Sequence, residues 1–214
     1  MKNDPGEARN RQRPRAALPP PPRPEAAPAP STAARPAVAR VIIRPARPDD
    51  LEEATLLERR VWGRLAATLN ELQRRLFALP EAFLLAELQR AGRPRQIVGL
   101  ANGLLWTRDF PRSYLEYERM LPSSSHNPRG DVLYLASVGV DPALRGHGIG
   151  LRLVQEVLEV GRRRHLKLTR LIANGRSRIL CARAGFEVVR PLPRLFRQYR
   201  DLMPQPVLME LPLL

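Results

Sequence analysis

Apolar residues follow two different spacings along this chain, and the changes between them separate predicted strands from predicted helices. Short apolar runs bounded by turn residues predict seven strands, over residues 39–44, 83–87, 96–106, 132–140, 168–173, 186–189 and 206–211. Apolar residues at every third or fourth position predict four helices, over 51–61, 69–77, 151–160 and 177–184. The order β-α-α-β-β-β-α-β-α-β-β predicts an α/β (α+β) fold in which helices flank a mixed sheet.

Turn and cap residues support several of these boundaries. Arg90-Ala91-Gly92-Arg93 lies between the second and third predicted strands, so these strands are expected to form a hairpin. Asp49 or Asp50 is placed to cap the first helix, with Glu52 or Glu53 near its third position in a capping-box arrangement.

Two stretches show neither spacing. Residues 1–38 contain ten of the 23 prolines, with alanine and arginine between them. Such a segment buries too little apolar surface to offset its chain entropy, so we expect a disordered tail followed by one folded domain over 39–214. Residues 107–129 are aromatic and polar, and a loop of this length inside a domain usually lines a site.

The composition is strongly basic, with a formal net charge of +15. The arginines are spread along the chain and aromatic residues are only 5% of it, so we do not expect a nucleic-acid partner. One cysteine excludes an intrachain disulfide, and no run approaches the roughly 18 apolar residues of a membrane helix. No secretory signal is recognisable, and we expect a cytoplasmic protein that does not associate with membranes.

The segment 145–150, Arg-Gly-His-Gly-Ile-Gly, stands between a predicted strand and a predicted helix. Glycines let backbone N–H groups approach an anion, and a helix N-terminus adds the positive end of its dipole. The spacing excludes a Rossmann fingerprint, whose third glycine would stand at Leu151, and a P-loop, which needs Lys-Ser/Thr after the second glycine. The pattern that remains is Arg-x-x-Gly-x-Gly at positions 145, 148 and 150.

This motif, after a strand that ends in Val-x-Val-Asp-Pro, resembles the GNAT acyltransferase superfamily, and within it uncharacterised bacterial members. The resemblance spans residues from about 41 to 213. It includes Ile43-Arg44-Pro45-Ala46 near its start, Ala184-Gly185-Phe186 after the last predicted helix, and the His-x-Pro-x-Gly segment 126–130. It implies a mostly antiparallel, splayed sheet.

The resemblance also implies acetyl-CoA as co-substrate and no metal. The pyrophosphate would lie on backbone N–H groups from Gly146 to Leu151, and the pantetheine arm would pair with the strand at Val138 and Val140. The Val140 N–H would stabilise the oxyanion. Asn174 matches a cofactor-contacting Asn of the family, although it could equally only cap the following helix. The implied cofactor-binding residues are Val138, Gly139, Val140, Arg145, Gly146, His147, Gly148, Ile149, Gly150, Leu151 and Asn174.

The chain departs from the family at the position of the usual acid. A Tyr normally stands four residues before the Gly of Gly-Phe, and here that position is Cys181. A thiol could protonate the leaving thiolate or take the acetyl group itself, whereas the alternative is a small buried helix residue beside the cofactor sulfur. Tyr134 is a second candidate for the catalytic acid.

No carboxylate is available on the central strand to serve as general base. The remaining candidates are Glu81, Glu87, Glu116 and His126, each of which could equally be a solvated or structural residue. His147 is expected to contribute through its backbone, and His165 to lie on the surface.

The resulting hypothesis is an acyl-CoA-dependent N-acetyltransferase that moves an acetyl group to a primary amine by direct attack. The acceptor would be a small molecule or a protein, and the enzyme a monomer or homodimer. An acyl-CoA-binding domain of the same fold without catalytic activity is the alternative, because the usual Tyr is missing. A basic nucleic-acid-associated protein is a third hypothesis, and it predicts strongly salt-dependent binding.

Overall fold

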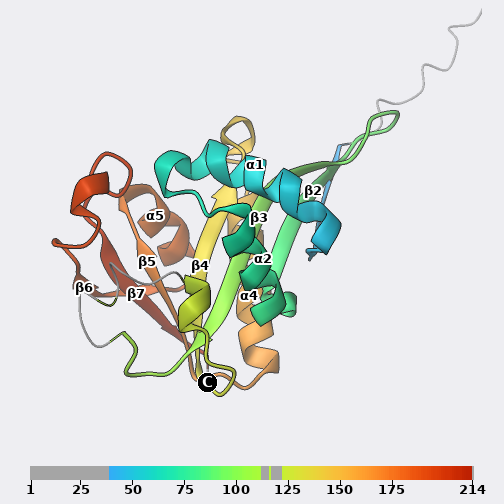
Figure 1. Cartoon of the computed structure of the whole chain (residues 1–214). Coiled ribbons are helices and arrows are strands. Elements are labelled where there is room, and N and C mark those ends of the chain that lie inside the picture. The colour runs from blue at the N-terminus through green and yellow to red at the C-terminus, as the bar shows by residue number, and fades with distance from the viewer. Residues whose placement is uncertain (1–38, 112–115, 117–121, 214) are drawn as a thin grey trace, which may run out of the picture. The chain divides into compact units, whose positions relative to one another are not determined.

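Seven strands form one sheet in the computed structural model, which describes residues 39–111, 116 and 122–213 (Figure 1). The predicted tail and much of the 107–129 loop therefore lie outside the described residues. The spatial order is β1-β2-β3-β4-β5-β7-β6, and every neighbouring pair is antiparallel except β4 and β5. The strands are β1 (Arg40–Pro45), β2 (Phe83–Gln89), β3 (Gln96–Trp106), β4 (Val132–Val140), β5 (Leu168–Ala173), β6 (Glu187–Pro191) and β7 (Val207–Pro212). The predicted element order, mixed sheet and hairpin are confirmed.

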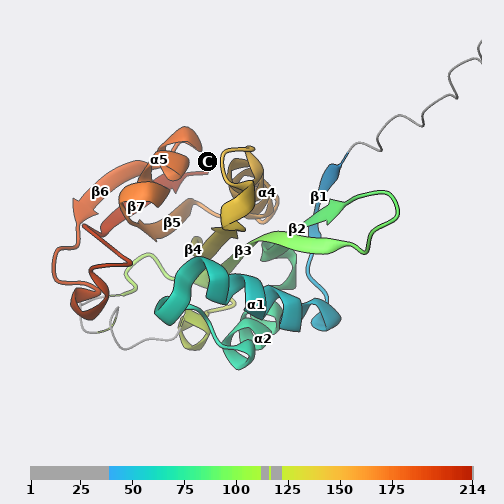
Figure 2. The ribbon, with the colours of Figure 1, turned by 90° about the horizontal axis from the view of Figure 1, so that it is seen from above.

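Helices cover both faces of the sheet. Figure 2 shows α1 (Leu51–Trp62) and α2 (Leu69–Ala78) on one face, and α4 (Ile149–Arg163) with α5 (Gly175–Arg183) on the other. Leu57 and Leu72 are fully buried between the first pair and the sheet, while Leu153 and Val157 are fully buried under α4. The amphipathic spacing that predicted these helices thus also determines which face of each helix packs on the sheet.

The parallel pair β4 and β5 separates after a short contact. Their register joins only Val132 to Leu168, Leu133 to Thr169 and Tyr134 to Arg170. Beyond Tyr134, β4 continues beside β3 alone, and β5 continues beside β7. The sheet therefore opens at its centre, as the predicted splay requires.

The two faces of β4 beyond this point meet different helices. Ala136 has no partner in β3, because Asn102 pairs with Ser137 while Gly103 pairs with Leu135. This bulge sets the direction of the following side chains. Gly139 faces α1, because a Cβ at this position would lie 3.2 Å from Val61. Val140 faces α4, because its Cγ2 would lie 3.5 Å from a Cβ at Gly150.

The predicted cap of α1 is wrong. Asp50 stands at the N-cap position but makes no side-chain cap hydrogen bond. Its buried carboxylate instead accepts two hydrogen bonds from Arg44 of β1, at 2.7 and 2.9 Å, and one from Arg95 at 3.0 Å. Arg44 and Arg95 also contact Glu87 of β2, so the acid that resembles a local cap belongs to an ion-pair network that joins β1, β2 and the β2–β3 turn.

Candidate active site

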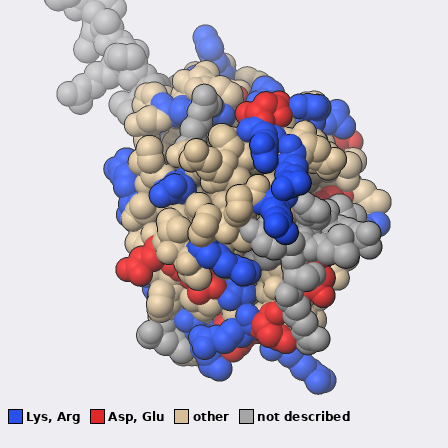
Figure 3. Space-filling model, turned by 90° about the vertical axis from the view of Figure 1, so that its left-hand side faces the viewer, with Lys and Arg blue, Asp and Glu red and all other residues tan. Residues whose placement is uncertain are grey.

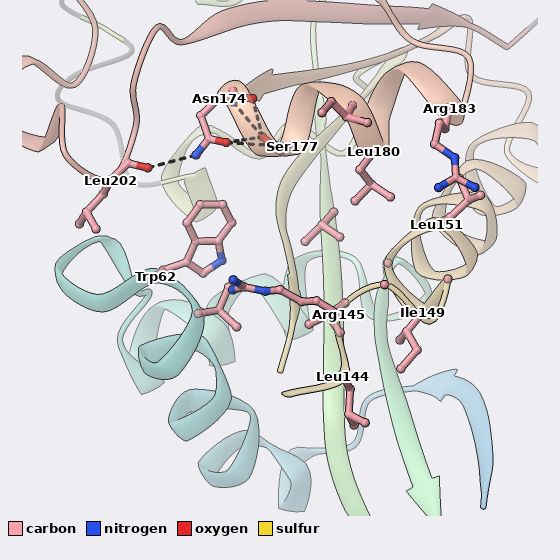
Figure 4. A pocket seen from close by; sticks show the side chains of 18 of the residues that line it. Trp62, Leu144, Arg145, Ile149, Leu151, Asn174, Ser177, Leu180, Arg183 and Leu202 are labelled. Atoms are coloured by element: carbon pink, nitrogen blue, oxygen red, sulfur yellow. Dashed lines mark hydrogen bonds between the residues drawn. The ribbon is translucent and has the colours of Figure 1, made fainter. Parts of the chain in front are cut away.

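A cavity of about 680 Å³ lies in the central opening of the sheet (Figure 4). The end of β4, the turn before α4, helix α5, the last turn of α1 and the connection between β6 and β7 contribute to its wall. The lining residues are Val61, Trp62, Val138, Val140, Leu144, Arg145, Gly146, Gly148, Ile149, Gly150, Leu151, Asn174, Gly175, Ser177, Ile179, Leu180, Arg183, Asp201, Leu202 and Pro204.

The glycine turn forms one polar part of this wall through its backbone. Gly146 and Gly148 have φ of 85° and 76°, values that side-chain-bearing residues rarely adopt, and a Cβ at Gly148 would meet no atom within 4 Å. Helix α4 starts at Ile149, and its first helical hydrogen bond runs from Arg152 N to Gly148 O. The N–H groups of the first three helical residues therefore have no acceptor within the helix and are available to an anion.

The opening between β4 and β5 supplies further backbone donors. Asp141 N–H donates to Val98 O of β3 at 2.8 Å. Because successive N–H groups of a strand point in alternate directions, those of Val138 and Val140 point away from β3, into the opening. Both residues are half-buried and line the cavity.

Arginines stand at both ends of the cavity. In Figure 4 the Arg145 side chain extends into the cavity toward Trp62, and Arg183 lies at the other end beside Leu151. Asp201 pairs with Arg64 at 2.9 Å, and the Arg64 guanidinium lies 5.9 Å from the ring centre of Tyr199. These contacts join the segment after α1 to the connection between β6 and β7.

Nine of the eleven predicted cofactor-binding residues line this cavity, and Gly139 and His147 are not among its lining residues. His147 is exposed, and its Nδ1 lies 3.2 and 3.1 Å from the carbonyl oxygens of Leu144 and Arg145. Asn174 Oδ1 accepts the Ser177 N–H at 3.1 Å, which caps α5, and Asn174 Nδ2 donates to Leu202 O at 3.1 Å. Asn174 therefore caps the helix and also lines the cavity.

The two predicted acids lie in the core and are not among the lining residues. Cys181 is 3% exposed, one position beyond the lining residue Leu180, and burial raises the pKa of its thiol to about 12. Tyr134 stacks on Trp106, with ring centres 3.5 Å apart. The catalytic role of either side chain stays a prediction.

The predicted bases have structural partners in the described part of the chain. Glu81 pairs with Arg164, and Glu87 belongs to the Arg44 network, where hydrogen bonds from Gln89 and Arg44 lower its pKa to about 2. His126 Nδ1 accepts the Leu105 N–H at 3.2 Å, and burial lowers the pKa of its ring. Glu116 is half-buried, and His165 is exposed as predicted.

The sequence did not reveal a buried carboxylate next to the cavity. Glu58 of α1 is 2% exposed, and both of its carboxylate oxygens lie 3.1 Å from Ser137 Oγ of β4. Ser137 Oγ also accepts a hydrogen bond from Trp62 Nε1 at 3.1 Å, and Trp62 lines the cavity. Burial raises the pKa of Glu58 above its ordinary value. The helical spacing of Leu51, Ala54 and Val61 places Glu58 on the apolar face of α1, but its partner Ser137 lies 79 residues away and has no local signal.

A second cluster of buried polar side chains, formed by Arg75, Glu71 and Asn102, adjoins Glu58. Arg75 of α2 donates to Glu71 at 2.8 Å and to Asn102 Oδ1 at 3.2 Å, and its charge partly offsets the rise in the pKa of Glu58. Glu71 also accepts the Ser123 backbone N–H at 3.0 Å. Asn102 pairs with Ser137 across β3 and β4, so the two polar groups meet at the bulge.

Comparison with known sequences identifies this arrangement. Residues 49–186, more than half of the chain, match the Acetyltransferase (GNAT) family. The chain belongs to the GNAT family. Its Arg-x-x-Gly-x-Gly turn, central opening and Gly-Phe segment are therefore features of a GNAT domain. The chain matches none of the curated proteins.

Solved structures confirm the GNAT fold. The loading GNATL domain of CurA from Lyngbya majuscula aligns with a TM-score of 0.65 at 17% identity, over 81% of this chain and 98% of that one. The GphF GNAT-like decarboxylase in complex with isobutyryl-CoA gives 0.65 at 22% identity, over 81% and 100%. Ard1 from Thermoplasma volcanium gives 0.57 at 19% identity, over 81% and 98%. These identities establish the fold alone.

One face of this GNAT domain carries its basic residues in several groups (Figure 3). Figure 3 shows the face with α5 and β6, where clusters of Lys and Arg are separated by uncharged and acidic residues. Among the described helices, none is both long and apolar enough to span a membrane. The described His, Cys, Asp and Glu side chains include no group of three that could hold a metal ion.

Proposed function

We propose that this protein is an N-acetyltransferase that moves the acetyl group of acetyl-CoA to a primary amine by direct attack. One observation carries the proposal: backbone donors of the glycine turn and of β4 line a single cavity, and they match the two polar parts of an acyl-CoA. The turn suits a diphosphate, because Gly148 leaves open space in front of the helix N-terminus. Val138 and Val140 suit an amide-containing arm, because their N–H groups point into the opening.

Charge at the cavity fits the same ligand. Arg145 and Arg183 line it and would attract a polyanion, while Asp201 is held by Arg64. GphF is a protein of the same fold whose structure holds isobutyryl-CoA, which supports an acyl-CoA as the ligand here. Bound acetyl-CoA would supply a thioester carbonyl for attack by the amine.

The chain's own groups would then assist the transfer. The Val140 N–H points into the opening and is available to the thioester oxygen as negative charge develops there. Cys181 stays a neutral thiol at pH 7, because its pKa is about 12. That value makes it a weak acid toward an ordinary thiolate, whose pKa is about 8.5, so solvent at the mouth of the cavity could supply this proton.

Two measurements on the full chain test this function. Acetyl-CoA at about 100 times its Kd should stabilise the fold by roughly 2.7 kcal/mol, which a rise in melting temperature would reveal. Release of free thiol should then occur with at least one member of a panel of small amines and N-terminal peptides. No thermal shift with acetyl-CoA or longer acyl-CoAs would contradict acyl-CoA binding altogether. A shift without thiol release would instead support an acyl-CoA-binding domain without transferase activity.

A further inference from the structure

We propose that Glu58 and Ser137 form a proton relay that receives the proton of the acceptor amine. This inference rests on the proposed acetyl transfer and names the residues that would make the amine reactive. Neither residue belongs to the glycine turn or to the predicted acids and bases. They come from α1 and β4, on the face of the strand opposite α4.

The contacts of Ser137 support a relay. Its hydroxyl has one proton, which it donates to Glu58, since both carboxylate oxygens lie 3.1 Å away. Its oxygen accepts the Trp62 N–H at 3.1 Å. Two residues that line the cavity therefore adjoin this serine. Trp62 donates a hydrogen bond to it, and Val138 follows it in the chain. An amine N–H that replaces the indole N–H would reach Ser137 Oγ with no change in the serine's bond to Glu58.

The surroundings of Glu58 keep it able to accept a proton. The side chain is 2% exposed, and no arginine pairs with it among the described residues, unlike Glu71 and Glu87. Arg75 influences it through charge but donates to Glu71 and Asn102. A buried carboxylate without a direct ion pair binds a proton more readily than one held by a guanidinium.

Each proton that moves in this step, and each bond that forms or breaks, is accounted for. Ser137 Oγ takes a proton from the attacking nitrogen and passes its own proton to the Glu58 carboxylate. Meanwhile the nitrogen–carbon bond forms and the carbon–sulfur bond breaks. The departing thiolate takes a proton from water, and Glu58 returns its proton to solvent after the products leave. The step requires the indole of Trp62, which is half-buried and next to Gly63 at the end of α1, to turn aside from Ser137.

The test compares Glu58→Gln and Ser137→Ala with Glu53→Gln, using the amine of the panel that gives the fastest thiol release. Glu53 is a matched control, because it also lies on α1 and accepts a strand N–H, from Ile97 at 2.7 Å. We expect each relay variant to lower kcat at least 100-fold with an unchanged acetyl-CoA thermal shift, and the control to stay within twofold. In the wild type, kcat should fall below a pH higher than the ordinary Glu value of about 4.3, and Glu58→Gln should lack this decline.

A second measurement needs no acceptor. Ionisation of Glu58 should change the emission of Trp62 through Ser137, so a fluorescence titration above the ordinary Glu value of about 4.3 should be present in the wild type and absent in Glu58→Gln. Turnover of Glu58→Gln within tenfold of wild type, with the same pH profile, would overturn the relay and leave the transferase intact. Cofactor binding with no thiol release from any amine would overturn the relay and the transferase together.

Discussion

The cavity has two sides that are built in different ways. The turn side consists of the glycine turn and the start of α4, and its polar groups include the backbone N–H groups of Ile149, Gly150 and Leu151, which have no acceptor within the helix. On the α1 side Trp62 lines the cavity, and behind it lie Glu58, Ser137 and the cluster of Arg75 with Glu71 and Asn102. Their polar atoms are side chains from four elements, α1, α2, β3 and β4. Backbone donors suit a ligand common to many proteins, whereas side-chain networks can differ between relatives.

This difference predicts that the two sides can be disabled separately. A change on the turn side should abolish acetyl-CoA binding and leave the fold unchanged. A change on the α1 side should affect turnover or stability and leave binding unchanged. The following variants test that separation, from the largest expected effect to the smallest.

Gly148→Glu should have the largest effect. It places a carboxylate in the space in front of the α4 N-terminus, where two like charges about 4 Å apart repel by roughly 4 kcal/mol. Acetyl-CoA affinity should therefore fall about a thousandfold, as measured by calorimetry. Gly92→Glu is the matched control, because Gly92 in the β2–β3 hairpin has a similar φ of 69° and equally open surroundings. Equal loss in both variants would mean that backbone strain, and not the phosphate site, is responsible.

Arg75→Met should mainly affect stability. It leaves Glu71 buried without its cation, which typically costs about 3–5 kcal/mol, measured by urea denaturation. Arg162→Met, which removes an exposed pair with Glu159, should cost less than about 1 kcal/mol. Acetyl-CoA should still bind Arg75→Met below its unfolding transition. A loss of binding at a temperature where the variant is folded would show that the two sides are coupled.

Cys181→Ala should have a smaller effect on catalysis. The thiol lies in the core behind the cavity wall, so we expect turnover within tenfold of wild type and a loss of about 1 kcal/mol in stability. Steady-state thiol release and thermal melts measure the two effects. A loss of a hundredfold or more in kcat, without a change in acetyl-CoA binding, would establish Cys181 as the acid that replaces the family's Tyr.

The smallest effect concerns pH and stability. Burial raises the pKa of Glu58 in the folded state, so its contribution is fully present below the unfolded pKa of about 4.3 and declines as pH rises through the folded value. As pH rises above about 4.3, the wild type should therefore lose stability relative to Glu58→Gln in urea melts. If the stability of the two proteins changed with pH in the same way, the pKa of Glu58 would not be raised in the folded state.

The sequence predicted the turn side because its information is local. The strand, the three glycines and the amphipathic helix follow one another from Val132 to Arg163, and backbone geometry depends little on distant partners. The hairpin and the four helices were predicted for the same reason. The GNAT family itself followed from this local pattern.

The α1 side could not be predicted because its partners are distant along the chain. The spacing from Leu51, Ala54 and Val61 places Glu58 on the apolar face of the helix, but nothing local indicates that Ser137, 79 positions later, is its partner. The prediction for Asp50 was wrong for a related reason. In the sequence it resembles a helix cap, but in the structure it pairs with Arg44 and Arg95. In each case the tertiary structure gives a charged side chain a partner that no local spacing indicates.

The early separation of β4 from β5 also bears on self-association. A row of unpaired strand donors and acceptors normally invites another chain to add a strand, and exposed sheet edges are a source of aggregation. Here the unpaired row lies in the middle of the sheet, flanked by α1 on one face and by α4 and α5 on the other. Because helices flank this row on both faces, we expect it to be open to a slender ligand but closed to pairing with a strand of another copy of the protein.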